Sequence, residues 1–125
     1  MKLFVDDLRC VPDDTWTLAR TNTEAIRLLA TGYVTECSID HDICVANFGQ
    51  ISVPLRRRLA IGEETFQPVA YYIAAMKPEL RPKKITLHSA NPAGAMRMRN
   101  ILFDSGIEVE IEESNCPFDL GEHEL

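Results

Sequence analysis

The fold of this chain follows from the stretch KLFVDD at residues 2–7, where a short β-favouring run ends abruptly in two aspartates. A run of this kind predicts a strand buried in a sheet, and Asp6 and Asp7 place carboxylates at its C-terminal end. Two further short runs, residues 36–40 and 84–88, also lead into polar residues. Three strands that each end in polar side chains predict a sheet with one polar edge.

The segments around these runs alternate between strand and helix patterns. Further strands are expected at residues 16–20 and 107–111, and the second of these alternates apolar residues with glutamates. Helices are expected after the capping box Thr21–Glu24, across residues 66–73 and across residues 92–104. Because a right-handed crossover packs each helix back onto a parallel sheet, we expect an α/β fold. The expected architecture is a three-layer sandwich with a five-stranded, mainly parallel sheet.

The chain length and the connections suggest one domain. With 125 residues and 46% hydrophobic content, the chain can bury a single core. About eight residues separate the first two strands, too few for a full crossover helix, so the first helix is expected to be reduced or missing. We expect the domain to span residues 1–113, with an irregular insert at about residues 43–64, and an acidic tail at residues 114–125.

Charge and hydropathy exclude some classes of protein. The formal net charge is −6, which argues against broad binding of nucleic acid, since a phosphate backbone rewards positive charge. Two aspartates interrupt the N-terminal segment where a signal peptide needs an apolar run, and no stretch has the 18 or so apolar residues of a membrane span. A cytoplasmic protein without a membrane partner is therefore expected.

Four aspartates follow the first and third expected strands: Asp6, Asp7, Asp40 and Asp42. A parallel sheet brings such strand ends together at the edge where ligands bind. Clustered carboxylates repel one another unless a cation neutralises them, and oxygen ligands select hard divalent ions. The sequence therefore predicts a metal site for Mg²⁺ or Mn²⁺, with these four aspartates as ligands.

The same edge carries groups suited to a phosphate. Arg9 can bind phosphate oxygens, as can the helix N-terminus at Ser89 and Asn91. His41 or His88 can then act as a general acid or base near neutral pH, beside Asp40. The alternative is structural: the polar residues cap turns, the histidines are hydrogen-bonded core residues, and the arginine pairs with an exposed carboxylate.

Four ordered motifs carry a family resemblance: K-L-F-V-D-D-x-R, W-T-L-A-R-T-x-x-E-A-I, S-I-D-H-D and I-T-L-H-S-A-N-P. Over about residues 2–102 the chain resembles the cyclic-phosphate processing receiver domains. The resemblance implies a receiver-like, flavodoxin-like fold and an activity on cyclic phosphates of nucleotides or RNA ends. It matches Asp6, Asp7 and Asp40 to the receiver acidic pocket, with Asp40 in the place of the phosphorylated aspartate. It also matches Ser89 to the hydroxyl residue that ends the fourth strand.

Two departures from signalling receivers narrow the function. No lysine follows the last expected strand, where the sequence is Glu112-Glu113-Ser114, and the first helix is lost. Both disfavour a conventional phosphorylation switch. The expected function is a divalent-metal-dependent phosphoesterase acting on a cyclic nucleotide or RNA-end phosphate. The alternative is a non-catalytic receiver-like module that holds a phosphate compound, or a protein partner through the insert or the tail.

Overall fold

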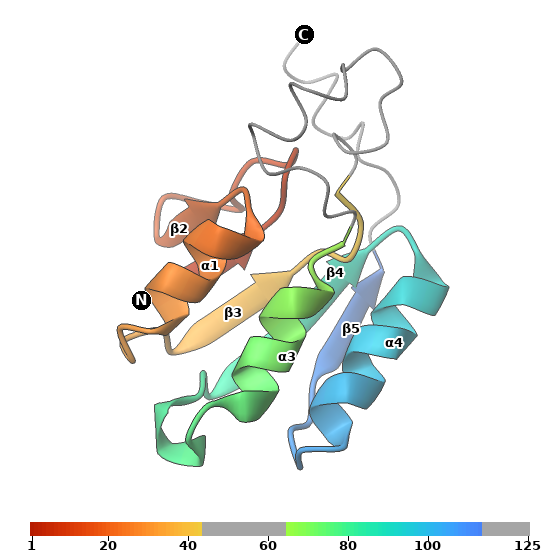
Figure 1. Cartoon of the computed structure of the whole chain (residues 1–125). Helices are drawn as coiled ribbons and strands as arrows, with labels where there is room; N and C mark the ends of the chain where they lie inside the picture. Colours follow the sequence, from red (N-terminus) through yellow and green to blue (C-terminus); the bar gives the residue numbers. More distant parts are fainter. Residues whose placement is uncertain (44–64, 114–125) are drawn as a thin grey trace, which may run out of the picture.

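The computed structural model describes residues 1–43 and 65–113 of the chain (Figure 1). Five strands form one sheet in the order β2-β1-β3-β4-β5, and every pairing is parallel. The strands are β1 (Lys2–Val5), β2 (Trp16–Ala19), β3 (Glu36–Ile39), β4 (Lys84–Ser89) and β5 (Glu110–Glu113). This order confirms the predicted α/β fold with the flavodoxin-like topology of receivers.

Within residues 1–43 and 65–113, three α-helices and one 3-10 turn connect the strands. They are α1 (Asn22–Leu29), α3 (Gln67–Ala75), η2 (Pro78–Leu80) and α4 (Pro92–Phe103). The predicted cap of α1 is present, since Thr21 Oγ1 accepts a hydrogen bond from the Glu24 N–H at 3.1 Å. None of the described helices is long and apolar enough to cross a membrane.

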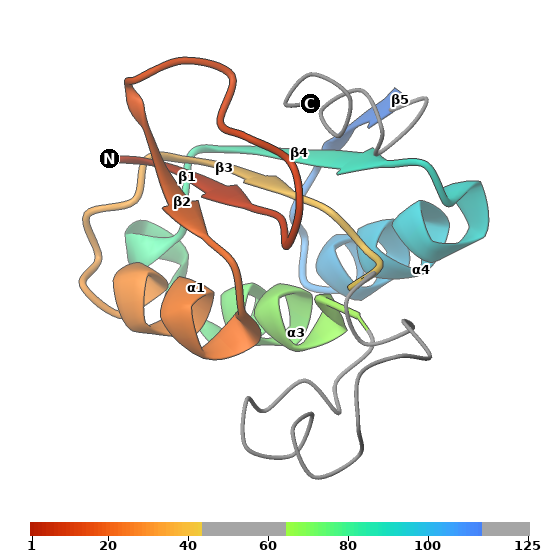
Figure 2. The same cartoon turned by 90° about the horizontal axis from the view of Figure 1, so that it is seen from above.

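The described helices lie on one face of the sheet (Figure 2). The helices α1, α3 and α4 pack side by side in this layer. A three-layer sandwich needs helices on both faces, and the described residues supply one helical layer. The reason is the predicted loss of the first helix, because the link from β1 to β2 holds bends and turns alone.

Alternation along the strands divides the side chains between the two faces. One residue of each pair enters the core under the helices: Leu3, Val5, Cys37, Ile39, Ile85 and Leu87. The helices complete this core with Val69, Ile73, Met98 and Leu102. Phe4, Ser38 and His88 alternate with these residues and contact one another on the helix-free face. The sheet therefore carries two different chemical environments.

The last strand begins later than the sequence predicts. The alternating pattern predicts residues 107–111, but β5 runs from Glu110 to Glu113. Ile107 and Val109 still pack against the core, whereas Ile111 is 44% exposed. The strand pairs with β4 alone and is an edge of the sheet, as its alternation predicts.

Some predictions fall outside the described part of the chain. The insert at about residues 43–64 and the tail at residues 114–125 lie almost wholly there. The division into a domain, an insert and a tail therefore stays a prediction.

Candidate functional site

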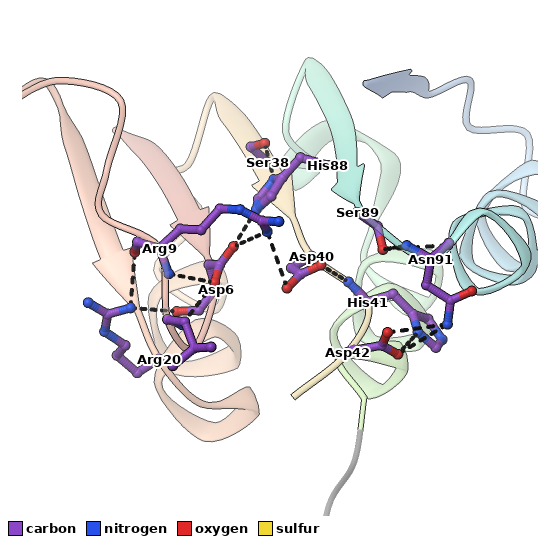
Figure 3. A network of polar contacts seen from close by, with 11 residues as sticks. Asp6, Arg9, Arg20, Ser38, Asp40, His41, Asp42, His88, Ser89 and Asn91 are labelled. Atoms are coloured by element: carbon purple, nitrogen blue, oxygen red, sulfur yellow. Dashed lines mark hydrogen bonds and ion pairs between the residues drawn. The ribbon is translucent and has the colours of Figure 1, made fainter. Parts of the chain in front are cut away.

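The predicted polar edge lies at the C-terminal ends of β1 and β3, which are neighbours in the sheet (Figure 3). Backbone hydrogen bonds continue past the strand ends, from the Asp6 N–H to the Ala19 carbonyl at 3.1 Å and from the Asp40 N–H to the Val5 carbonyl at 2.9 Å. The two aspartates are thereby held in the sheet's register. They share a pocket of about 120 Å³ lined by Asp6, Asp7, Leu8, Arg9, Asp40, Asp42 and Ala90.

Three of the four predicted metal ligands converge in this pocket. Asp6, Asp7 and Asp40 each place a carboxylate oxygen within 4.8 Å of the other two. Asp42 lines the pocket without joining this group. An all-oxygen set of this kind suits Mg²⁺ or Mn²⁺, since hard cations prefer carboxylate ligands. The residues thus fit the predicted ion, and the metal itself stays a prediction.

Arg9 spans the two buried carboxylates. Its Nη1 donates to Asp6 Oδ2 at 3.0 Å and lies 3.6 Å from Asp40 Oδ2 (Figure 3). The Arg9 side chain is 11% exposed. Arg20 supports the loop from behind, because its Nη1 donates to the Arg9 carbonyl at 3.0 Å. Arg9 therefore pairs with carboxylates inside the pocket and not with an exposed carboxylate.

The two carboxylates that Arg9 joins differ in their pKa. Burial raises the pKa of Asp6, but hydrogen bonds from His88 and from the backbone N–H groups of Arg9 and Leu8 outweigh it, and the pKa falls to about 2. Burial and the neighbouring charge of Asp6 raise the pKa of Asp40 to about 8, against the lowering effect of the His41 N–H and Arg9. Near neutral pH the pocket therefore holds one firmly ionised carboxylate beside one that retains its proton.

His88 lies behind Asp6 and does not line the pocket. Its Nε2 is 2.9 Å from Asp6 Oδ2, and its Nδ1 is 2.7 Å from Ser38 Oγ. The ring stacks on Phe4, with centroids 4.5 Å apart and planes 5° from parallel. These three contacts are all on the helix-free face of the sheet.

His41 belongs to a separate cluster, which lies at the N-terminal ends of α3 and α4. Its Nδ1 is 2.7 Å from Asp42 Oδ1, and its Nε2 is 3.1 Å from Gln67 Nε2 at the start of α3. Gly94 of α4 lies against the ring, where a Cβ would come within 2.3 Å of Nδ1. His41 is buried and does not line the pocket either.

The predicted phosphate residues of the fourth strand end shape the start of α4. Asn91 is the N-cap, and its Oδ1 accepts from the Gly94 N–H at 3.0 Å while its Nδ2 donates to Asp42 Oδ2 at 3.2 Å. Ser89 Oγ accepts from the Asn91 N–H at 3.0 Å. Ala90 between them lines the pocket, so the segment that leads from β4 into α4 reaches the pocket.

Sequence reasoning overlooked Arg20, Ser38 and Gln67. Ser38 had a usable signal, since it lies two residues before Asp40 and period-two alternation puts both on one face. Arg20 ends the second predicted strand, at the same edge as the aspartates. Gln67 had no signal, because its contact with His41 joins segments 26 residues apart in the chain.

Comparison with protein families matches residues 1–104 to the cyclic-phosphate processing receiver domain. This confirms the resemblance drawn from the four motifs. Comparisons with curated proteins and with solved structures found no match. Since the match covers most of the 125 residues and the sheet has the receiver strand order, the chain belongs to the family of cyclic-phosphate processing receiver domains.

Proposed function

We propose that this chain is a divalent-metal-dependent phosphoesterase that opens cyclic phosphates of nucleotides or RNA ends. The observation that carries the proposal is the convergence of Asp6, Asp7 and Asp40 beside Arg9 in one pocket. Membership of a family involved in cyclic-phosphate processing supports the substrate class.

Mg²⁺ or Mn²⁺ would be held by Asp6, Asp7 and Asp40, with Asp42 at the rim. When bound, the cation supplies Lewis-acid polarisation of a phosphate oxygen. The guanidinium of Arg9 can bind a second phosphate oxygen, since it already lies between two pocket carboxylates. Ala90 lines the pocket just before the N-cap of α4, so the positive end of that helix dipole lies near the pocket.

The pocket is matched to a phosphate group and not to a whole nucleotide. Its volume of about 120 Å³ compares with roughly 300–1,000 Å³ for pockets that enclose drug-sized ligands. The described residues therefore contact the cyclic phosphate while the base lies outside the pocket. We expect little discrimination between bases by this pocket.

Ring opening consumes one water. The water oxygen bonds to phosphorus, one ring P–O bond breaks, and the departing ribose oxygen takes a proton. Of the predicted catalytic residues, Asp40 lines the pocket, while His41 and His88 each lie behind a carboxylate that does. We therefore assign the ring-opening step to the pocket carboxylates and not to the histidines.

The second candidate is a module that holds a phosphate compound without turnover. The position of His41 and His88 behind the pocket carboxylates favours this candidate. A proton carrier must come within hydrogen-bond reach of the reacting atoms, and neither histidine lines the pocket. A non-catalytic module could instead hold a protein partner through the insert or the tail. Those two segments lie outside the described residues.

Calorimetry with Mg²⁺ and Mn²⁺ tests the proposal, followed by ³¹P NMR of a 2′,3′-cyclic nucleotide. Wild type should bind the ion and open the ring, and Asp40→Asn should do neither while keeping its circular dichroism. Asp104→Asn is the matched control, since Asp104 is exposed beyond the end of α4. Metal binding without turnover would favour the second candidate, and wild-type turnover by Asp40→Asn would contradict the assignment.

A further inference from the structure

We infer that His88 is a positioning residue, which holds Asp6 in the orientation of a metal ligand and carries no proton to or from the substrate. The inference rests on the proposed function for the role of Asp6. It makes Ser38 part of the same arrangement, because Ser38 engages the other ring nitrogen of His88.

Hydrogen-bond chemistry places a proton on Nε2 of His88. An ionised carboxylate can only accept, so the contact of Nε2 with Asp6 Oδ2 at 2.9 Å requires an N–H at Nε2. Nδ1 lies 2.7 Å from the Ser38 hydroxyl and is engaged there. Both ring nitrogens are occupied inside the protein, which leaves the imidazole no vacant nitrogen to offer a substrate.

Packing holds the ring in this orientation. His88 is on β4 and Asp6 follows β1, so the imidazole reaches across β3 to make its contact. Ser38 on β3 is small enough to lie beneath it, and Phe4 stacks against it at 4.5 Å. His88, Ser38 and Phe4 are all at least 94% buried. A rotation of the ring would break the stack and both hydrogen bonds together.

Asp6 is the group that this arrangement fixes. Its Oδ1 accepts from the Leu8 and Arg9 N–H groups at 2.9 Å each, and its Oδ2 accepts from Arg9 and His88. His88 supplies the contact from the far strand β4, which sets the direction of Oδ2. Hydrogen bonds that orient a metal ligand are typically worth about 10- to 100-fold in metal affinity.

Two variants separate positioning from proton transfer. The amide of His88→Gln reaches the place of Nε2 and can still donate to Asp6, whereas the amide of His88→Asn reaches only the place of Nδ1, toward Ser38. Both lose the ring that stacks on Phe4, and they differ from each other by one methylene and by the position of the amide. We expect His88→Asn to lose about 10- to 100-fold in Mn²⁺ affinity and His88→Gln to stay near wild type in affinity and in kcat.

Opposite results overturn the inference. Equal affinity in the two variants would remove the orienting role, and normal affinity with lost kcat in His88→Gln would make His88 a proton carrier. A second measurement, ¹⁵N NMR of the imidazole in metal-free wild type and Ser38→Ala, is independent of both variants. A protonated Nε2 is expected, and an unprotonated Nε2 contradicts the inference. Absence of metal binding by wild type would instead contradict the proposed function, while protonation of Nε2 would still be read from the spectrum.

Discussion

Two histidine clusters lie on opposite faces of the sheet and repeat one pattern. In each, an imidazole joins a pocket carboxylate to a neutral polar group, as Asp6–His88–Ser38 on the helix-free face and as Asp42–His41–Gln67 beneath the helices. Their carboxylates differ in exposure, since the side chain of Asp6 is 1% exposed and that of Asp42 is 39% exposed.

The two clusters differ in what they hold in place, so we expect them to have different roles. Asp6 receives hydrogen bonds from the β1 loop and from β4, so its cluster secures a ligand within the sheet. Asp42 is tied through His41 and Asn91 to the starts of α3 and α4, so its cluster secures helices against the sheet. Changes in the first cluster should weaken metal binding, and changes in the second should weaken the fold.

The largest expected effect on Mn²⁺ affinity comes from replacing the carboxylate of each cluster by an amide. Asp6→Asn should lower Mn²⁺ affinity by about 100-fold, or about 3 kcal/mol, because a neutral amide replaces a charged carboxylate ligand. Asp42→Asn should cost about tenfold or less, because its exposed carboxylate is outside the group of three. Calorimetric titration of the two variants side by side measures this ratio. Equal losses would erase the distinction between the clusters.

Gly94→Ala tests the second cluster through packing alone. The new Cβ would lie 2.3 Å from His41 Nδ1, so the ring or α4 must shift, at a cost of about 1–3 kcal/mol in the free energy of unfolding. Urea denaturation measures the loss, with Arg97→Ala on the exposed side of α4 as the control. Mn²⁺ affinity of the folded protein should change little. Unaltered stability would mean that α4 is not held close to His41.

The pKa values predict opposite pH effects for the two buried carboxyls. The folded pKa of Asp40, about 8, exceeds the ordinary aspartate value of 3.8, so folded protein binds the extra proton between those pH values. Stability of the metal-free protein from this group should therefore be present below pH 3.8 and fall as the pH rises toward 8. Asp6, with a folded pKa of about 2, stabilises above pH 3.8 and loses that contribution as the pH falls through 2.

Urea denaturation of metal-free protein at pH 5 and pH 8 checks this, with Asp40→Asn as the comparison. Wild type should be less stable at pH 8, and the variant should lose much of that difference. Mn²⁺ should bind more tightly as the pH rises, by up to about tenfold per unit below pH 8, because it competes with one proton. A slope that Asp40→Asn leaves unchanged would assign the titration to another group.

The smallest expected effect concerns His41. The amide of His41→Asn can occupy the place of Nδ1 and still donate to Asp42, whereas His41→Gln can only replace Nε2 near Gln67. We expect His41→Gln to be the less stable of the two by about 1 kcal/mol, the usual worth of one hydrogen bond. Thermal unfolding compares them directly. A larger loss in His41→Asn would mean that the contact with Gln67 matters more than the contact with Asp42.

Local pattern was sufficient to predict much of the fold. Each strand of residues 2–5 and 84–88 is a short run that sends alternate apolar side chains into the core under the helices, and the α1 cap is read directly from Thr21 and Glu24. The start of β5 was misplaced, because Ile107 and Val109 pack against the core before the backbone pairs with β4. Alternation reports burial of side chains and carries no information on where the ladder begins.

The sequence by itself determined the α/β class and the identity of the residues at the polar strand ends, because strand and helix periods and strand-end chemistry are local properties of the chain. Tertiary structure alone decided which of those residues meet. It grouped Asp6 and Asp7 with Asp40, and it sent the two histidines to opposite faces behind different carboxylates. Strand order and the side of the sheet covered by helices set those contacts, and both depend on packing between segments far apart in the chain.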